Sequence, residues 1–166
     1  KQIIDKKAEK EMEEVFAVIT TIRNMRAELD IPLQAPNLCV KIATAKKTGR
    51  ALIEANETHI KSLARVANLS IEEEYRHRPG EFVNILKDMH IAIPLEGIID
   101  IEKHKKKIED KISKAQNDIK AKETMLANKD FIKRAPAEII EGEREKLKAL
   151  NEEIAKLKGV KDGLNS

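Results

Sequence analysis

The sequence of 166 residues is long enough for one ordinary domain, or for a small domain with an extended appendage. Charged residues make up 37% and aromatic residues only 2%, which is typical of long solvated helices rather than of a compact globule. The single cysteine, Cys39, excludes an internal disulfide. With no apolar run of membrane-spanning length and no secretory signal, we expect a cytoplasmic protein without membrane contact. Because the first residue is Lys1, we also expect the chain to be part of a longer one.

The net charge of +3 is concentrated in one segment. Residues 101–134 hold 11 Lys and Arg against 6 Asp and Glu, whereas residues 1–100 hold 15 against 16 and residues 135–166 hold 6 against 7. A local basic surface indicates a polyanionic partner more strongly than the overall isoelectric point does.

Residues 3–29 are predicted to form one amphipathic helix, because apolar residues recur at helical spacing between charged ones. These residues are Ile4, Ala8, Met12, Val15, Ile19, Ile22 and Leu29. Pro32 ends the helix, since the residue before a proline is excluded from the helical conformation. Pro32 and Pro36 bracket a short loop.

Residues 36–97 are predicted to form a small α+β domain. Leu38, Val40 and Ile42 alternate with other residues as in a strand. A helical pattern over residues 49–67 is broken around 56–58. Further short strands are predicted at residues 71–75, 82–86 and 89–93, with a turn at Pro79-Gly80.

Residues 98–166 are predicted to form a long antiparallel coiled-coil hairpin. Two helices, over residues 101–128 and 136–159, are joined by residues 128–135, and Pro136 suits the first turn of the second helix. The predicted fold class is therefore mainly α, with an N-terminal helix, a small α+β unit and a two-helix hairpin.

Heptad positions a and d form an apolar seam on both helices of the hairpin. Its members are Ile108, Ile112, Ala115, Ile119 and Leu126 on the first helix and Ile140, Leu147, Leu150, Ile154 and Leu157 on the second. One alignment sets Ile112 across from Leu150 and centres the turn near Phe131. It opposes unlike charges in the pairs Glu109–Lys158, Glu123–Arg144, Lys111–Glu153 and Asp118–Lys146. A slide of one heptad would oppose Asp118 and Glu153, so we predict the first alignment.

A set of lysines, here called the lysine face, falls on the outer b, c and f positions of the first helix. Its members are Lys103, Lys106, Lys107, Lys114 and Lys120. One interpretation is a solvated face that keeps a coiled coil soluble. The other is a phosphate-binding surface, because a one-sided lysine stripe can displace counterions from a polyanion.

The sequence offers no catalytic or metal-binding pattern. His59, His77, His90 and His104 are far apart and are interpreted as surface residues, and Cys39 as a buried small apolar residue. No glycine-rich phosphate-binding motif is present. We therefore expect no active site, metal or cofactor in this chain.

Four stretches, in this order, resemble the C-terminal part of valyl-tRNA synthetases. They are IRNMRAE at residues 22–28, LARV at 63–66, IPLEGIIDIEK at 93–103 and NKDFIKRAPAEIIEGEREKL at 128–147. The fourth is the most specific. Gly142 departs from the family, which usually has a charged helix former there, and costs roughly 1 kcal/mol relative to Ala. We expect the first turns of the second helix to be looser for this reason.

The resemblance implies a non-catalytic, C-terminal tRNA-binding portion of a valine–tRNA ligase. The family's class I catalytic and editing domains precede this region, and their HIGH and KMSKS signatures are absent here; ATP would be used by the parent enzyme, outside this chain. Residues 1–35 would be the last helix of the anticodon-binding helical domain with a linker, residues 36–97 a junction domain, and residues 98–166 an arm that packs on the tRNA elbow. The implied partners are a valine-accepting tRNA and the rest of the synthetase, and we expect a monomer.

The resemblance favours tRNA binding by the lysine face and by Lys129, Lys133 and Arg134 at the hairpin tip, although these tip residues could instead cap a helix end. Arg23 and Arg26 match the family's motif and serve either RNA binding or packing within the helical domain. The alternative for the whole chain is a structural coiled-coil spacer or dimerisation module that does not bind nucleic acid.

Overall fold

The computed structural model describes residues 5–35 and 37–165. The chain forms two compact units, one extending to Asp100 and the other comprising Ile101–Gly163. Long helices and one small sheet confirm the predicted fold class. Residues 3 and 4 of the predicted first helix, and Pro36 of the predicted loop, lie outside the described residues.

The first helix, α1 (Lys6–Glu28), begins at Asp5, whose side chain accepts hydrogen bonds from two main-chain amides of the first turn. After the helix, Asp30 adopts a φ of 51°, and the amide of Ile31 bonds back to the carbonyl of Arg26 at 2.9 Å. A left-handed residue at this position reverses the chain and satisfies the last carbonyls. The inner face of α1 is buried through Val15, Val18, Ile22 and Met25.

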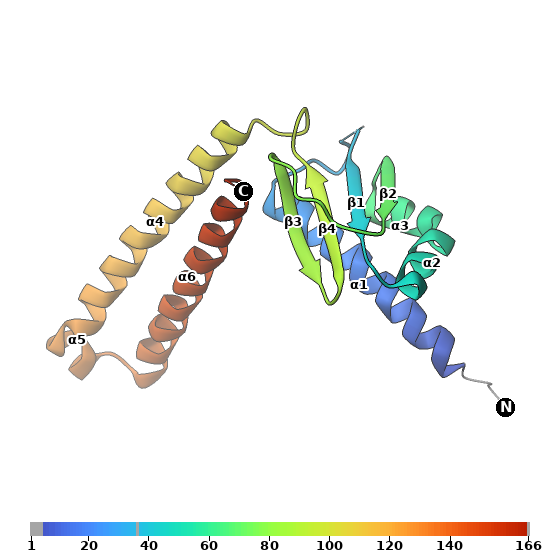
Figure 1. The fold of residues 1–166 in the computed structure, drawn as a ribbon. Coiled ribbons are helices and arrows are strands. Elements are labelled where there is room, and N and C mark those ends of the chain that lie inside the picture. Colours follow the sequence, from blue (N-terminus) through green and yellow to red (C-terminus); the bar gives the residue numbers. More distant parts are fainter. Residues whose placement is uncertain (1–4, 36, 166) are drawn as a thin grey trace. The chain divides into compact units, whose positions relative to one another are not determined.

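Four strands form one sheet in the order β2-β1-β4-β3. β1 (Cys39–Ala43) runs parallel to β2 (Asn68–Glu72), whereas β4 (Met89–Pro94) is antiparallel to both β1 and β3 (Glu81–Leu86). A parallel pair needs a crossover, and α2 (Lys47–Ala55) with α3 (Glu57–Ala64) provides it. Figure 1 shows α1 passing behind the sheet, with α2 and α3 beside β2.

The segment after β2 differs from its prediction. The strand predicted over residues 71–75 ends at Glu72, and residues 73–80 instead cross the sheet face to reach β3 (Figure 1). On that face the ring of Tyr75 stacks on His90, with centroids 4.9 Å apart and planes 6° apart. This ring contact and the hydrogen bond that the Tyr75 hydroxyl donates to Glu81 at 3.4 Å, rather than a strand ladder, hold Tyr75 in place.

Two side chains lie differently from their predicted positions. Cys39 is half-buried rather than buried, because Leu38 and Val40 point into the core and Cys39 therefore points to the other face. His104 is buried, not a surface residue, because it lies one turn before Ile108 on the buried stripe of its helix.

The second unit contains two long helices, α4 (Ile101–Ala127) and α6 (Ala137–Gly163), each of 27 residues. At about 1.5 Å per residue, each is roughly 40 Å long. The connection between them contains a short helix, α5 (Lys129–Arg134), for which the sequence predicted no element of its own. Asn128 begins α5 by accepting hydrogen bonds from the amides of Asp130 and Phe131 at 2.9 and 3.3 Å.

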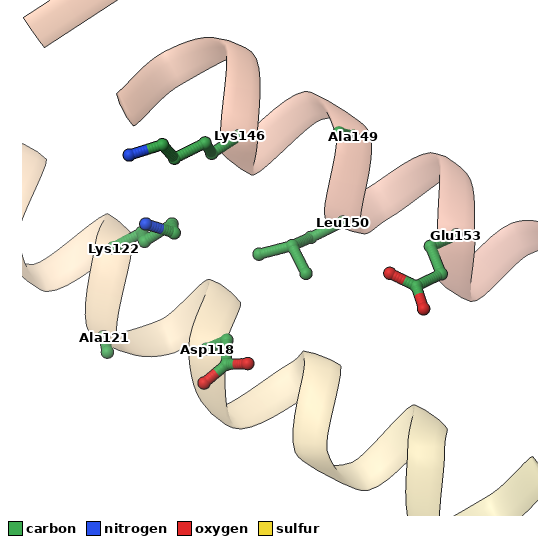
Figure 2. A pocket seen from close by; sticks show the side chains of 7 residues that line it. All are labelled: Asp118, Ala121, Lys122, Lys146, Ala149, Leu150 and Glu153. Carbon is green, nitrogen blue, oxygen red and sulfur yellow. The ribbon is translucent and has the colours of Figure 1, made fainter. Parts of the chain in front are cut away.

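The predicted apolar seam is confirmed, because Ile108, Ala115 and Ile154 at heptad positions a and d are buried; buried His104 and Val160 lie beside it at position g. The predicted alignment is wrong by one heptad. Glu109 pairs with Lys161 at 2.7 Å rather than with Lys158. Leu150 lies across from residues 118–122, not from Ile112, as Figure 2 shows.

Two features explain this shift. Lys122 and Glu143 occupy d positions of the seam and pair with each other, their side chains only 23% and 14% exposed. α5 also lengthens the connection between the two long helices. The first residues of α6 therefore lie beyond the end of α4 rather than alongside it. Each exposed ion pair on which the predicted alignment was based contributes about 0.2–1 kcal/mol. These pairs are too weak to outweigh the Lys122–Glu143 pair and the longer connection. Arg144, for example, pairs with Glu141 on its own helix.

Candidate nucleic-acid interface

Every member of the lysine face is exposed on α4. The seam occupies positions a and d, so side chains at b, c and f project from the opposite side of the helix. Lys103 and Lys107 also interact with other groups of the protein. The structure thus brings together five ammonium groups on one outer side of the hairpin.

The predicted tip residues Lys129, Lys133 and Arg134 are also exposed, on α5. Lys133 and Arg134 lie in the last turn of this helix, where positive charge also interacts favourably with the helix dipole. Their position suits both tRNA binding and capping of the helix end, the two roles predicted for them.

A groove of about 540 Å³ lies between α4 and α6, lined by residues 118–122 and 146–153 (Figure 2). At one end of it, Lys122 and Lys146 both bond to Glu143, at 2.5 and 2.6 Å. These hydrogen bonds hold the pKa of the Glu143 carboxyl below its ordinary value, and the bond from Lys122 has the largest effect. Lys122 and Lys146 are therefore ion-paired within the hairpin. The basic surface that faces outward is the lysine face.

Arg26 is only 4% exposed and is held by main-chain carbonyls. Its Nη1 donates to the carbonyl oxygens of Ala64 and Arg65 at 2.7 and 2.8 Å, and its Nη2 to that of Pro32 at 2.6 Å. Burial, and then the charge of Arg65, lower the pKa of this guanidinium. This geometry favours packing over RNA binding for Arg26.

Arg23 is exposed, and its Nε donates to the carbonyl of Leu63 at 2.9 Å. Together with Arg26 it satisfies the last carbonyls of α3, where a helix dipole favours positive charge. Arg65, which follows α3 with a φ of 53°, lies beside both arginines and was missed as a site residue. The sequence feature that could have pointed to Arg65 is its position in the LARV stretch, residues 63–66.

Neither a metal site nor a membrane span is found in the part of the chain that the structure describes. Within residues 5–35 and 37–165, no group of three or more His, Cys, Asp or Glu is placed to hold a metal ion. No helix there is long and apolar enough to cross a membrane.

Residues 100–165 match the family model for the valyl tRNA synthetase tRNA binding arm, and this segment includes the whole second unit, Ile101–Gly163. The chain is 36% identical over 141 residues to the valine–tRNA ligase of Geobacter sulfurreducens, covering 82% of this chain and 15% of that protein. For the enzyme of Thermotoga maritima the identity is 31% over 160 residues, covering 96% and 18%.

The chain belongs to the valyl-tRNA synthetase family. The ligase of Bradyrhizobium diazoefficiens, 35% identical over 92% of this chain, is a further relative. The chain spans only 15–18% of the length of these three ligases. The similarity therefore relates it to the C-terminal region of the synthetase family, and the first unit lies within that region as well.

Proposed function

We propose that the hairpin of α4, α5 and α6 is the tRNA-contacting arm of a valine–tRNA ligase, and that its lysine face binds the backbone at the tRNA elbow. The observation that carries this proposal is the exposure of all five lysines on one outer side of α4, within the segment that matches the tRNA binding arm.

The dimensions of the lysine face suit a nucleic-acid backbone. From Lys103 to Lys120 the helix rises about 25 Å, a length over which a polynucleotide presents several phosphates. Each phosphate neutralised by a lysine releases condensed counterions, which favours binding. A-form RNA is recognised mainly through its shape and backbone, because its deep major groove is closed to side chains. A lysine stripe without aromatic residues fits recognition of this kind.

The first unit would connect this arm to the rest of the synthetase. In this proposal α1 ends the anticodon-binding helical domain, and the sheet with α2 and α3 forms a junction domain. Aminoacylation with ATP would take place in other domains of a monomeric, cytoplasmic ligase, and this chain would hold the valine-accepting tRNA without a cofactor of its own.

The test is binding of fluorescently labelled valine-accepting tRNA to the chain at increasing salt. We expect log K to fall linearly with log salt, with a slope of about −0.9 per phosphate contact on duplex. Binding that is absent at low salt, while circular dichroism shows a folded chain, would overturn the proposal. Sedimentation of the same sample would then show whether the chain is a dimerisation module.

A further inference from the structure

The apolar seam of the hairpin is incompletely covered over most of its length. Ala115 and Ile154 are buried, but Ile119, Leu147 and Leu150 are only half-buried. No residue from 116 to 153, all of which the structure describes, is buried. Complete burial of a seam needs more than one neighbouring helix, as in coiled coils of three or four helices. The two helices of the hairpin therefore leave apolar surface uncovered.

This uncovered surface forms a groove on one side of the hairpin. The groove of about 540 Å³ beside Leu150 continues away from the tip into a second hollow of about 390 Å³, which Asp118, Leu150 and Glu153 also line. We call the two together the hairpin groove. All of its lining residues occupy heptad positions c, d and g, so they belong to one side of the hairpin. Its apolar members are Ala115, Ala121, Ala149, Leu150 and Leu157.

The hairpin groove carries opposite charges at two levels. Figure 2 shows Lys122 and Lys146 at one end of it and the carboxylates of Asp118 and Glu153 toward the other. The two lysines share the carboxylate of Glu143, which leaves one positive charge at their end. Within residues 5–35 and 37–165, neither Asp118 nor Glu153 forms an ion pair. The groove therefore offers two carboxylates to a basic side chain and one ammonium charge to an acidic side chain.

We propose that the hairpin groove binds an amphipathic helix of a separate protein, which becomes the third helix of a coiled coil. The partner helix packs apolar side chains on Leu150 and Leu157 and places a lysine or arginine between Asp118 and Glu153. An acidic side chain about one turn further along it meets Lys146. A helix that lies in an apolar groove is a recurring mode of protein recognition. This partner is additional to tRNA, because the lysine face lies on the outer side of α4.

A reversible protein partner fits the hairpin groove better than RNA or a permanent neighbour does. The carboxylates of Asp118 and Glu153 would repel phosphates. Surfaces that stay covered in permanent assemblies are more apolar than those of transient complexes, whereas these two carboxylates and Lys146 are exposed at the rim. Ala121 and Ala149 are small, so a helix can approach closely.

Photocrosslinking of the full-length ligase in cells that produce it tests the proposal. A benzophenone amino acid replaces Ala149 in the hairpin groove, and in a matched control it replaces Ala155, an exposed residue of α6 outside the groove. From position 149 we expect several-fold more crosslinking than from position 155, to one helical segment of another protein. That segment should carry a basic and an acidic residue about one turn apart. Absence of a crosslink would overturn the proposal, as would a crosslink to tRNA, to another segment of the ligase or to a second copy.

Charge reversal tests the basic residue of the partner. Asp118→Lys with Glu153→Lys should reduce the crosslink from position 149 several-fold, because like charges would then meet. Asp118→Asn with Glu153→Gln, which adds no charge, should reduce the crosslink less. Asp110→Lys with Glu152→Lys, at exposed acidic positions outside the groove, should leave the crosslink unchanged. Equal crosslinking in all three double variants contradicts the proposal. Failure of the lysine face to bind tRNA would not change the crosslink, so the two proposals can fail separately.

Discussion

The guanidinium of Arg26 donates a hydrogen bond to the main-chain carbonyl of Arg65 at 2.8 Å, across 39 residues of sequence. Arg65 has the left-handed conformation that ends α3, and an L-residue held there costs roughly 1–2 kcal/mol. The bond from Arg26 helps to hold it. The stretches IRNMRAE and LARV, separate in the sequence, therefore form one structural element.

This arrangement predicts that Arg26 stabilises the first unit far more than Arg23 does. Arg26→Ala leaves three carbonyls without a charged donor in a buried place, so we expect a loss of about 3 kcal/mol in the free energy of unfolding. Arg23→Ala, which removes one bond from an exposed side chain, should cost about 1 kcal/mol. Urea denaturation measures both. Similar losses in the two variants would contradict the assigned difference.

Charge reversal on the lysine face should weaken tRNA binding. We choose Lys114→Glu with Lys120→Glu, both exposed on α4. The salt slope should become shallower by about 0.9 for each phosphate that a lysine no longer neutralises, and KM for tRNA in the full-length ligase should rise. Lys156→Glu, at an exposed position of α6, is the matched control and should change both quantities less. An unchanged KM in the double variant would leave the lysine face as a solvated surface.

Gly142→Ala should stabilise the hairpin. The glycine lies inside the continuous helix α6, and a Cβ there would meet no atom within 4 Å. We expect a gain of roughly 1 kcal/mol, the difference in helix propensity between the two residues. Gly49→Ala is the contrasting variant, because its Cβ would lie 3.4 Å from Met89, and its gain should be smaller or absent. Thermal unfolding of each variant checks the order.

The hairpin should lose stability in acid through Glu143. Because the pKa of this carboxyl is lowered in the folded chain, its contribution is present above the ordinary glutamate pKa of about 4.3 and disappears as pH falls through the lower, folded value. Glu143→Gln should therefore flatten the dependence of the melting temperature on pH in this range. Glu141→Gln, at an exposed residue paired with Arg144 at 3.8 Å, should leave that dependence nearly unchanged.

Much of the fold could be predicted from periodicity. α1, the break between α2 and α3, and the seam of α4 and α6 all follow from the spacing of apolar residues, because burial of one helix face is a local property of the sequence. The lysine face could be placed on the outer side of α4 for the same reason.

The alignment of the hairpin could not be predicted from exposed charges. Lys122 and Glu143 lie within the seam, and a heptad pattern that counts only apolar residues at a and d overlooks them. The cluster of Arg23, Arg26 and Arg65 escaped prediction because its arginines come from segments about 40 residues apart. Their meeting depends on where α3 ends, which the periodicity located only within a few residues.

The central position of β1 affects how the chain folds. β1 pairs with β2 on one side and with β4, about 50 residues later in the sequence, on the other. Sheets built from such distant pairings form slowly, because each pairing must first close a long loop. The contacts of the hairpin can instead begin beside its short connection, as between Lys122 and Glu143, and extend from there along the two helices. During synthesis, β1 must therefore wait for Pro94 to emerge, and until then its edge is open to pairing with other chains.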